Sequence, residues 1–166
     1  IAKSFDLLNL KLIAFLYPPS PFRLPPFPML PWYHNGLRFQ CTGCGDCCTG
    51  GPGYVWVNQA EIDALAKRLD MSPAAFEKAY VRQVGVRRTL KELTKRNYDC
   101  VFLDAETRRC TVYEDRPRQC RTWPFWDSNL KSPESWAETA AHCPGCNQGP
   151  LILLEEIELF RQSRRV

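Results

Sequence analysis

Histidine is scarce in this 166-residue chain, which has only His34 and His142. Catalytic zinc sites usually take histidine and carboxylate ligands and keep one position open for water. The sequence therefore offers little material for a hydrolytic zinc centre. The same scarcity leaves no nucleophile–histidine constellation and no general acid–base pair that the sequence itself reveals.

Long apolar runs are also missing. A membrane-spanning helix needs about 20 continuous apolar residues, and the apolar stretch 7–17 is short and interrupted by Asn9 and Lys11. The net charge of +4 is modest, and no recognisable nucleic-acid-binding module accompanies it. No glycine motif typical of nucleotide binding is evident. We therefore expect no membrane span and no nucleic-acid partner.

Cysteine, in contrast, is abundant, with nine residues of which four lie within the stretch QCTGCGDCCTG. An odd number leaves one thiol over in any complete disulfide scheme. A chain of this size with 45% hydrophobic residues can also fold without covalent cross-links. A thioredoxin-like redox pair would need a βαβ frame, which is not apparent around Cys41. Thiols kept for metal imply a reducing compartment, so we expect a cytoplasmic protein.

The spacing of the first cysteines indicates a metal cluster. Cys41-x-x-Cys44-x-x-Cys47 has the step of the run that binds a [4Fe-4S] cluster in bacterial ferredoxins, where a distant Cys-Pro pair completes a site. Cys143-Pro144 supplies such a pair. Structural zinc sites usually take one Cys-x-x-Cys pair from each of two places, and Cys143-x-x-Cys146 is the other pair available. The spacing favours iron–sulfur, and zinc remains the alternative.

Apolar periodicity predicts an α+β fold: a compact, mainly helical single domain with a small β-hairpin or sheet and irregular cysteine-bearing loops. The capping-box pair Asn58 and Glu61 predicts one helix start, and Ser72-Pro73 predicts another. A strand is expected at 54–57 and a hairpin from 100–103 with 110–113. A further helix is expected from 132 to 144. The final amphipathic helix, at 150–162, is expected to bury Leu153, Leu154, Ile157 and Phe160.

Three parts follow along the chain. Residues 1–31 form an apolar, proline-rich arm, because half of the 14 prolines fall between Pro18 and Pro31 and such a stretch runs extended. Residues 32–149 form the cysteine-cluster domain, and residues 150–166 form the C-terminal helix. The arm is too apolar for a free linker. We expect it to lie along the domain, a protein partner or a second copy, which would make a homo-oligomer.

The segments FQCTGCGDCC, GYVWV, DCVFLD, RRCTVYEDRPRQCRTWPF and HCPG together resemble the YkgJ-type cysteine-cluster family, the zinc- or iron-chelating CxxCxxCC domain. The resemblance covers about residues 32–149. It implies a metal-binding protein, and similar domains in flagellin lysine methylases keep an enzymatic role open. Carried over residue by residue, the family cysteines are Cys41, Cys44, Cys47, Cys48, Cys100, Cys110, Cys120 and Cys143. Cys146 falls outside that pattern.

Eight cysteines suggest up to two tetracysteine sites, each holding a [4Fe-4S] cluster. We expect Cys41, Cys44 and Cys47 with one distant cysteine at the first site. Cys48 is expected to point away from Cys47 and to join the second site. Two anionic clusters are costly to bury, and five arginines near the later cysteines could offset their charge: Arg108, Arg109, Arg116, Arg118 and Arg121. The predicted function is an electron-transfer or metal-handling accessory; the alternatives are a structural zinc interaction module and a cluster-dependent modifying enzyme resembling a protein methylase.

Overall fold

The computed structural model of the protein describes residues 30–163. The predicted proline-rich arm lies almost entirely outside the described residues. Its expected contact with a partner or a second copy therefore stays a prediction. Residues 1–31 and residues 32–166 form separate units. All the described helices and strands belong to the second unit.

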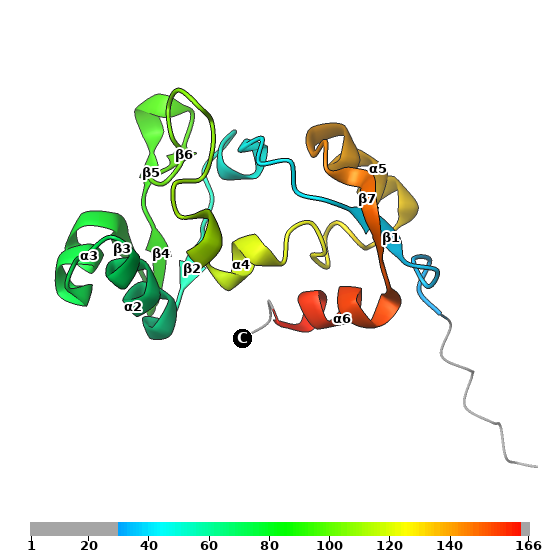
Figure 1. Cartoon of the computed structure of the whole chain (residues 1–166), viewed down its shortest axis with the longest axis horizontal. Coiled ribbons are helices and arrows are strands. Elements are labelled where there is room, and N and C mark those ends of the chain that lie inside the picture. Colours follow the sequence, from blue (N-terminus) through cyan, green and yellow to red (C-terminus); the bar gives the residue numbers. More distant parts are fainter. Residues whose placement is uncertain (1–29, 164–166) are drawn as a thin grey trace, which may run out of the picture. The chain divides into compact units, whose positions relative to one another are not determined.

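The described residues contain helices together with small antiparallel sheets, which confirms the α+β prediction (Figure 1). The α-helices are α2 (Gln59–Arg68), α3 (Pro73–Tyr80), α4 (Arg118–Arg121), α5 (Pro133–His142) and α6 (Leu154–Ser163). The strands are β1 (Leu37–Phe39), β2 (Trp56–Val57), β3 (Val81–Val84), β4 (Arg87–Leu90), β5 (Glu92–Leu93), β6 (Asp99–Cys100) and β7 (Cys146–Ile152). Short 3-10 turns are η1 (Asp46–Cys48), η2 (Thr94–Arg96) and η3 (Tyr113–Asp115).

The two helix starts predicted from capping residues are both present. Asn58 Oδ1 accepts from the Glu61 amide at 3.0 Å, and Glu61 Oε2 accepts in return from the Asn58 amide at 2.9 Å. The reciprocal bonds satisfy two amide groups that the first turn of α2 would otherwise leave without partners. Ser72 Oγ accepts from the Ala75 amide at 3.2 Å in the same way, with Pro73 in the first turn of α3.

Helices α2 and α3 pack with the three-stranded sheet, whose strand order is β2-β4-β3. Ile62, Leu65 and Phe76 have no exposed surface. Burying an apolar side chain of this size contributes roughly 1.5–3 kcal/mol each. We name this cluster the α2–α3 core; its members are Val57, Ile62, Leu65, Ala66, Phe76, Leu90, Phe102 and Val112.

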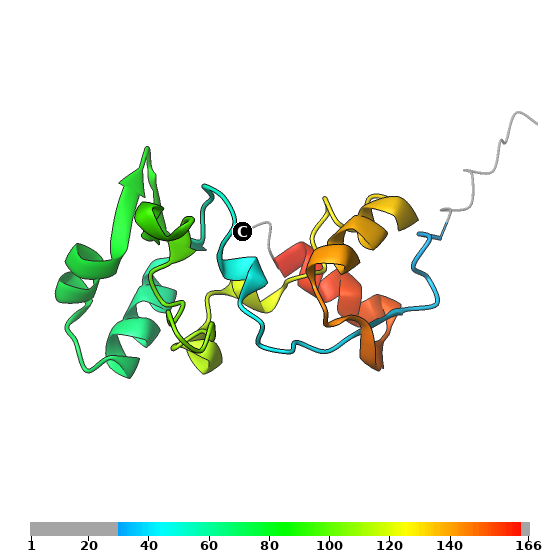
Figure 2. The same cartoon turned by 90° about the horizontal axis from the view of Figure 1, so that it is seen from above.

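A second cluster, the α5–α6 core, forms where β1 pairs with β7. Phe125 lies at its centre and stacks against Trp136 and Phe160, with ring centroids 5.9 and 5.6 Å apart. The members are Tyr33, Leu37, Phe125, Leu130, Trp136, Cys143, Cys146 and Ile157. In Figures 1 and 2 the green α2 and α3 stand at one end of the unit, the orange α5 and red α6 stand at the other, and the cyan segment near residues 41–50 runs between them.

Two element predictions need correction. Residues 150–152 belong to β7 and not to the final helix, because Leu37 pairs with Ile152 and Arg38 with Leu151. The helix begins only at Leu154, and Leu153, expected on its buried face, is exposed. The hairpin expected from 100–103 and 110–113 is reduced to an isolated bridge between Leu103 and Cys110, since β6 pairs instead with β5.

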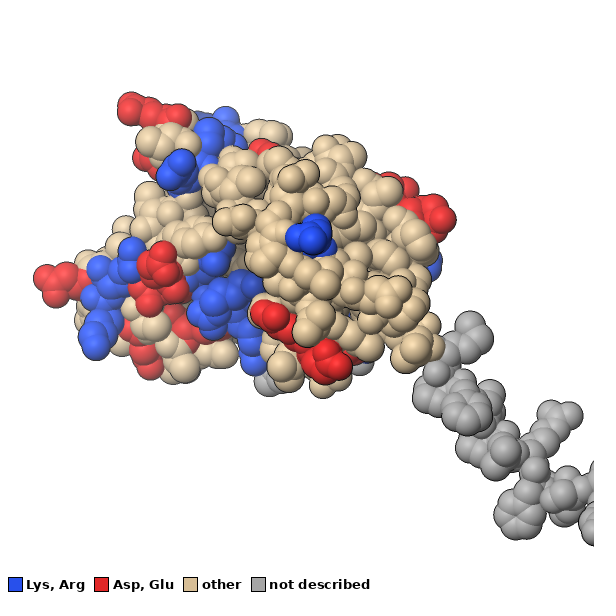
Figure 3. Space-filling view, turned by 45° about the vertical axis from the view of Figure 1, so that its right-hand side comes forward, with Lys and Arg blue, Asp and Glu red and all other residues tan. Residues whose placement is uncertain are grey.

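Surface charge is unevenly distributed. On the face shown in Figure 3, basic and acidic side chains are mixed toward one end, and a broad neighbouring area is mostly uncharged. Ion pairs of opposite charge, such as Arg68 with Asp115 at 2.7 Å and Arg88 with Glu77 at 3.1 Å, occur in the α2–α3 half. Among residues 30–163 no helix is both long enough and apolar enough to cross a membrane.

Candidate metal centre

The four clustered cysteines lie on a tightly turned loop. Gly43 and Gly45 both have positive φ, +71° and +81°, a conformation that costs glycine nothing and other residues appreciably more. The Cys48 amide donates to the Gly45 carbonyl at 2.8 Å and closes the η1 turn. Gly45 also packs directly against the Arg108 carbonyl, where a Cβ atom would have no room. The glycines therefore hold the loop against the chain around Cys110.

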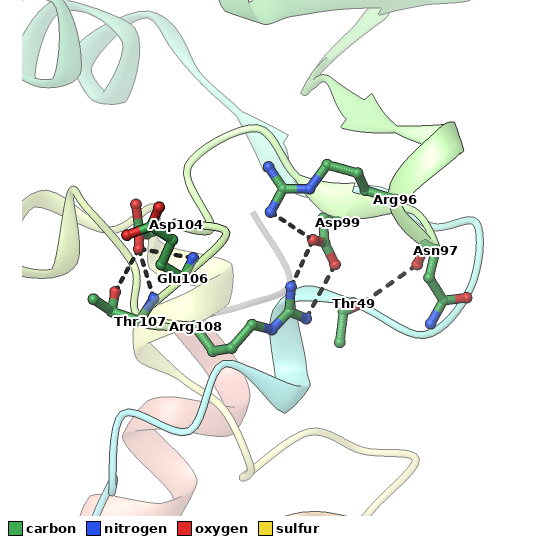
Figure 4. A network of polar contacts seen from close by, with 8 residues as sticks. All are labelled: Thr49, Arg96, Asn97, Asp99, Asp104, Glu106, Thr107 and Arg108. Atoms are coloured by element: carbon green, nitrogen blue, oxygen red, sulfur yellow. Dashed lines mark hydrogen bonds and ion pairs between the residues drawn. The ribbon is translucent and has the colours of Figure 1, made fainter.

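A buried carboxylate anchors the same region (Figure 4). Asp99 is 2% exposed and accepts two hydrogen bonds from Arg108, at 2.6 Å (Nη1 to Oδ2) and 3.1 Å (Nη2 to Oδ1). Arg96 Nη2 reaches the same carboxylate at 3.1 Å. The hydrogen bonds from Arg108 are the main reason that the pKa of Asp99 is lowered to about 2. Asp99 immediately precedes Cys100, so this network fixes the position of that cysteine.

The cysteine loop is tied to the same segment through Asn97. Its carbonyl accepts from Thr49 Oγ1 at 3.3 Å and from the Gly50 amide at 3.1 Å. These bonds join residues 49 and 50, directly after Cys48, to Asn97, which lies just ahead of Tyr98 and Asp99; Figure 4 shows the bond from Thr49. Thr49 and Asn97 thus bring cysteines about 50 positions apart in sequence into one region.

The later cysteines come from four different elements. Cys100 ends β6, and Cys110 sits at the bridge to Leu103. Cys120 lies within the short helix α4, and Cys143 is the C-cap of α5. Only the tertiary structure brings these positions near the loop 41–48, because intervals of 10, 10 and 23 residues give no local reason for contact.

All eight cysteines of the predicted set line one cavity of about 150 Å³. Its apolar walls come from both core clusters, with Phe102 and Val112 from the α2–α3 core and Phe39 and Trp123 packed on the α5–α6 core. The cavity therefore lies between the two cores. Cys146 is buried but is not among the lining residues.

Four of these thiols interact with one another electrostatically. Burial raises the pKa of Cys120, and the neighbouring Cys100, Cys47 and Cys110 raise it further. Burial likewise raises the pKa of Cys100 to about 11, with Cys110 and Cys47 again contributing. The pKa of Cys110 is raised by burial, while Arg116 acts in the opposite direction. The raised pKa values favour the protonated thiols, whose protons a bound cation would displace.

The expected divergence of Cys47 and Cys48 is wrong. Their sulfurs are 3.8 Å apart, because residues 46–48 form a 3-10 turn and not an extended segment. The hydrogen bond with Cys48 is the largest cause of the raised pKa of Cys47. The two sulfurs thus lie side by side at the cavity wall.

Arg116 is the arginine that lines the cavity among the five expected to offset cluster charge. Its guanidinium lies over the Tyr113 ring, 3.5 Å from the centroid. Its Nε atom is buried and has no hydrogen-bond partner among residues 30–163. Such an unsatisfied buried donor is costly unless an acceptor occupies the cavity. The other four arginines are absent from the cavity wall; Arg108 is bound to Asp99, and Arg121 donates to the Arg116 carbonyl at 2.7 Å.

Cys143 has two donors directed at its sulfur. Trp123 Nε1 donates to Cys143 Sγ at 3.4 Å, and the Cys146 thiol donates a second hydrogen bond that is the main reason the pKa of Cys143 falls to about 5. The same hydrogen bond raises the pKa of Cys146. The interaction therefore favours the ionised form at Cys143, on the cavity wall, over the ionised form at Cys146.

The donor set fits a thiophilic metal centre, since every candidate is a soft sulfur ligand. In the described part of the chain, no three His, Cys, Asp or Glu side chains stand close enough together to hold a single metal ion. The eight sulfurs are instead distributed around the cavity wall. Asp99 was not predicted as a site residue from the sequence; its position immediately before Cys100 was the available signal.

Comparison with known proteins gives a relative and a family. Over 94 residues the chain is 33% identical to the protein named Uncharacterized protein MJ0661 of Methanocaldococcus jannaschii. The aligned region is 56% of this chain and 48% of the relative, so the chain spans about half the length of the curated relative it matches. No solved structure matches the chain. The family CxxCxxCC, described as "Putative zinc- or iron-chelating domain", matches residues 40–146. That range contains all nine cysteines of the chain, the eight that line the cavity and Cys146, and covers more than half of the chain, so the protein belongs to the CxxCxxCC family.

Proposed function

We propose that the protein binds iron–sulfur clusters through the eight cavity cysteines and serves as an electron-transfer or metal-handling accessory. One observation carries this proposal: eight thiols from five separate segments wall the same cavity of about 150 Å³. Thiolate-only ligation suits either structural zinc or iron–sulfur clusters. The choice between them depends on the size and charge of what the cavity can hold.

The size of the cavity favours a cluster. Structural zinc draws four ligands to about 2.3 Å from one ion, which leaves no open volume among the sulfurs. Here the sulfurs surround a space that a polynuclear core of iron and sulfide could fill. The apolar walls of Phe102, Val112 and Trp123 would limit access of water to that core, which is one of the factors that set a cluster's reduction potential.

The charge of the wall also favours an anionic group. A cluster held by four thiolates is anionic, and hydrogen bonds to its sulfurs stabilise it and tune its potential. Arg116 supplies a half-buried cation whose buried Nε–H has no acceptor among the described residues. Trp123 Nε1–H already donates to the sulfur of Cys143. Both side chains would act on sulfur atoms without being ligands themselves.

The electrostatic neighbours suggest a grouping of the ligands. Cys100, Cys110 and Cys120 are electrostatic neighbours, and Cys47 raises the pKa of each of them. Cys47 also neighbours Cys48 and Cys143, so it lies between the two groups, and we place it with the first three at one tetracysteine site. The remaining predicted ligands, Cys41, Cys44, Cys48 and Cys143, would form the second. This grouping keeps Cys47 and Cys48 at different sites, as the sequence predicted, but it assigns Cys47 to the later cysteines.

Bound clusters would supply one-electron transfer. The protein's own contribution would be to exclude water, to fix the ligands through the Asp99 network, and to place positive charge at Arg116. Cys41 and Cys47 are exposed, which would bring one side of the centre near a partner's redox group.

A second cavity, of about 190 Å³, favours the enzymatic alternative. It shares Cys47, Cys48, Cys100 and Cys120 with the first cavity. Its other lining residues include Tyr54, Tyr98 and Trp126. A cluster-dependent enzyme needs a small-molecule pocket of this kind beside its metal. Turnover of a bound substrate, as opposed to reversible reduction alone, would separate the enzyme from the carrier.

Metal analysis tests the proposal. Protein purified without oxygen should be brown, absorb near 400 nm and contain iron and acid-labile sulfide in equal amounts, with Mössbauer spectra reporting the cluster type. Cys100→Ser and Cys44→Ser should each lower the iron content, whereas Cys146→Ser, which alters a cysteine outside the cavity, should retain it. A colourless protein that contains zinc and no sulfide would overturn the iron–sulfur proposal in favour of the structural zinc module.

A further inference from the structure

Cys146 has no part in the cavity, yet it is held directly against a cysteine that does. Its amide donates to the Cys143 carbonyl at 3.0 Å. The sequence Cys143-Pro-Gly-Cys146 thus forms a closed turn with one cysteine at each end. The two residues are 9% and 5% exposed.

The turn is fixed from outside by the strand that leads to Cys41. The Gln40 amide donates to the Gly145 carbonyl at 3.1 Å, and Gly145 packs so closely against the Gln40 carbonyl that a Cβ atom would not fit. On the other side Trp123 Nε1 holds the sulfur of Cys143 at 3.4 Å. Because the frame is already formed, bringing the two sulfurs together costs little additional conformational entropy.

We propose that Cys143 and Cys146 are a redox-active dithiol, which a small hydroperoxide oxidises to a disulfide and a dithiol reductant restores. Of these two cysteines, Cys146 is the one to which no metal-binding role is assigned. Oxidation would remove Cys143 from the ligands of the cavity; this consequence alone rests on the proposed metal function.

The geometry gives the two sulfurs different roles. Cys143 lines the cavity, and two other residues of its wall, Cys41 and Cys47, are exposed to solvent. A molecule as small as hydrogen peroxide can therefore approach Cys143 through the cavity. Cys146 lies behind it and is absent from the cavity wall, so it is placed to attack Cys143 after the first step.

The reaction balances in two steps. The Cys143 thiolate attacks one oxygen of hydrogen peroxide, the O–O bond breaks, and a proton from solvent completes the release of one water, leaving a sulfenic acid on Cys143. The Cys146 thiol then attacks that sulfur, forming the S–S bond and displacing the hydroxyl group, which leaves as water with the thiol proton. Two electrons pass from the sulfur pair to the peroxide, and a dithiol such as dithiothreitol returns them by exchange.

The other close pair of sulfurs is a weaker candidate. Cys47 and Cys48 are 3.8 Å apart at sulfur, but consecutive Cα atoms are only about 3.8 Å apart, shorter than the usual separation across a disulfide of roughly 4.4–6.8 Å. A bond between them would strain the chain. The two pairs can be told apart by mapping, and so provide an internal comparison.

The test uses the full-length protein, reduced and then treated with a small excess of hydrogen peroxide. Free thiols are alkylated, and the disulfides are mapped by mass spectrometry. We expect a Cys143–Cys146 disulfide, two mass units lighter than the dithiol, that dithiothreitol reverses. In Cys146→Ser, with folding checked by circular dichroism, Cys143 should instead proceed to sulfinic acid. Free thiols at both positions in the wild-type protein, or a disulfide at Cys47–Cys48 alone, would overturn the proposal.

Metal content measured on the same samples separates the two proposals. Loss of bound metal on oxidation and its rebinding after reduction would support the withdrawal of Cys143. If the disulfide forms and the metal is retained, the proposed loss of Cys143 as a ligand is wrong, whereas the redox-active dithiol stands. A protein that never contains metal would refute the proposed function, yet the mapping would still decide whether the dithiol exists.

Discussion

Arg108 donates two hydrogen bonds to the buried carboxylate of Asp99, at 2.6 and 3.1 Å. The backbone of Arg108 also closes over Gly45. A single residue thus joins the segment before Cys100 to the loop that carries the first four cysteines. Breaking a charge pair of this kind leaves a buried charge without its partner, which is more costly than never having formed the pair.

Asp99→Asn should destabilise the fold and loosen the cysteine loop, because Arg96 and Arg108 lose the charge they share. Urea denaturation should show a lower midpoint than wild type, and thiols of the loop should react faster with a maleimide. Asp104→Asn is the matched control, since Asp104 accepts only from its own turn at Thr107 and Glu106. Equal midpoints for the two variants would refute the anchoring role of Asp99.

Gly45→Ala should reduce the stability of the fold more than Gly43→Ala. Both glycines have positive φ, so alanine at either position carries a strain of about 1 kcal/mol or more. Only Gly45 also packs against the Arg108 carbonyl, whereas nothing lies within 4 Å of a Cβ at Gly43. We expect a total cost of roughly 1–3 kcal/mol at Gly45 and a lower metal content, measured by denaturation and elemental analysis. A Gly43 variant as unstable as the Gly45 variant would argue against close packing as the cause.

Arg116→Met should leave the fold intact and change the metal centre. The substitution removes a buried N–H donor that has no partner in the described part of the chain, so the loss of hydrogen bonding within the fold is small. If an anionic cluster accepts that bond, its reduction potential should fall, and its loss in air should accelerate. Arg109→Met, at an exposed position outside the cavity wall, is the control. Identical potentials in the two variants would exclude Arg116 from the centre's surroundings.

Removal of the metal should weaken the link between the two core clusters. The cavity has walls from both the α2–α3 core and the α5–α6 core, so a bound group contacts both. A ligand that binds only the folded state at 1,000 times its Kd adds about 4 kcal/mol. Treatment with a strong chelator should lower the thermal midpoint and diminish the near-ultraviolet circular dichroism of the tryptophans. An unchanged midpoint after verified metal removal would contradict this prediction.

Alkaline pH should test the packing of Tyr33. Burial, followed by its hydrogen bond to Glu158 at 2.7 Å, raises the pKa of Tyr33 to about 12, compared with about 10 in an unfolded chain. Because the neutral phenol is favoured in the folded state, its stabilisation is complete below pH 10 and is lost as the pH rises from 10 through about 12. Tyr33→Phe should lose stability less steeply over this interval. Parallel unfolding curves of the two proteins between pH 9 and 12 would refute the raised pKa.

Local signals in the sequence were reliable where one turn of chain decides the structure. The capping box at Asn58 and Glu61 and the Ser72-Pro73 start predicted α2 and α3 because both depend on contacts within four residues. The start of the last helix was predicted wrongly because Leu151 and Ile152 fit either a helix or a strand. Leu151 and Ile152 belong to a strand because they pair with Arg38 and Leu37, which lie more than 110 residues away in the sequence.

The identity of the eight cysteines was determined by the sequence itself, since their number, spacing and flanking residues carry the resemblance to the family that the chain belongs to. Their arrangement was decided only by the tertiary structure. Cys47 and Cys48 lie side by side because glycines with positive φ turn the loop, Arg116 faces the cavity while four other arginines do not, and Cys146 lies behind Cys143. The physical reason is that soft-ligand chemistry belongs to each side chain, whereas distance and burial depend on long-range contacts such as those of Asp99 with Arg108 and Gln40 with Gly145.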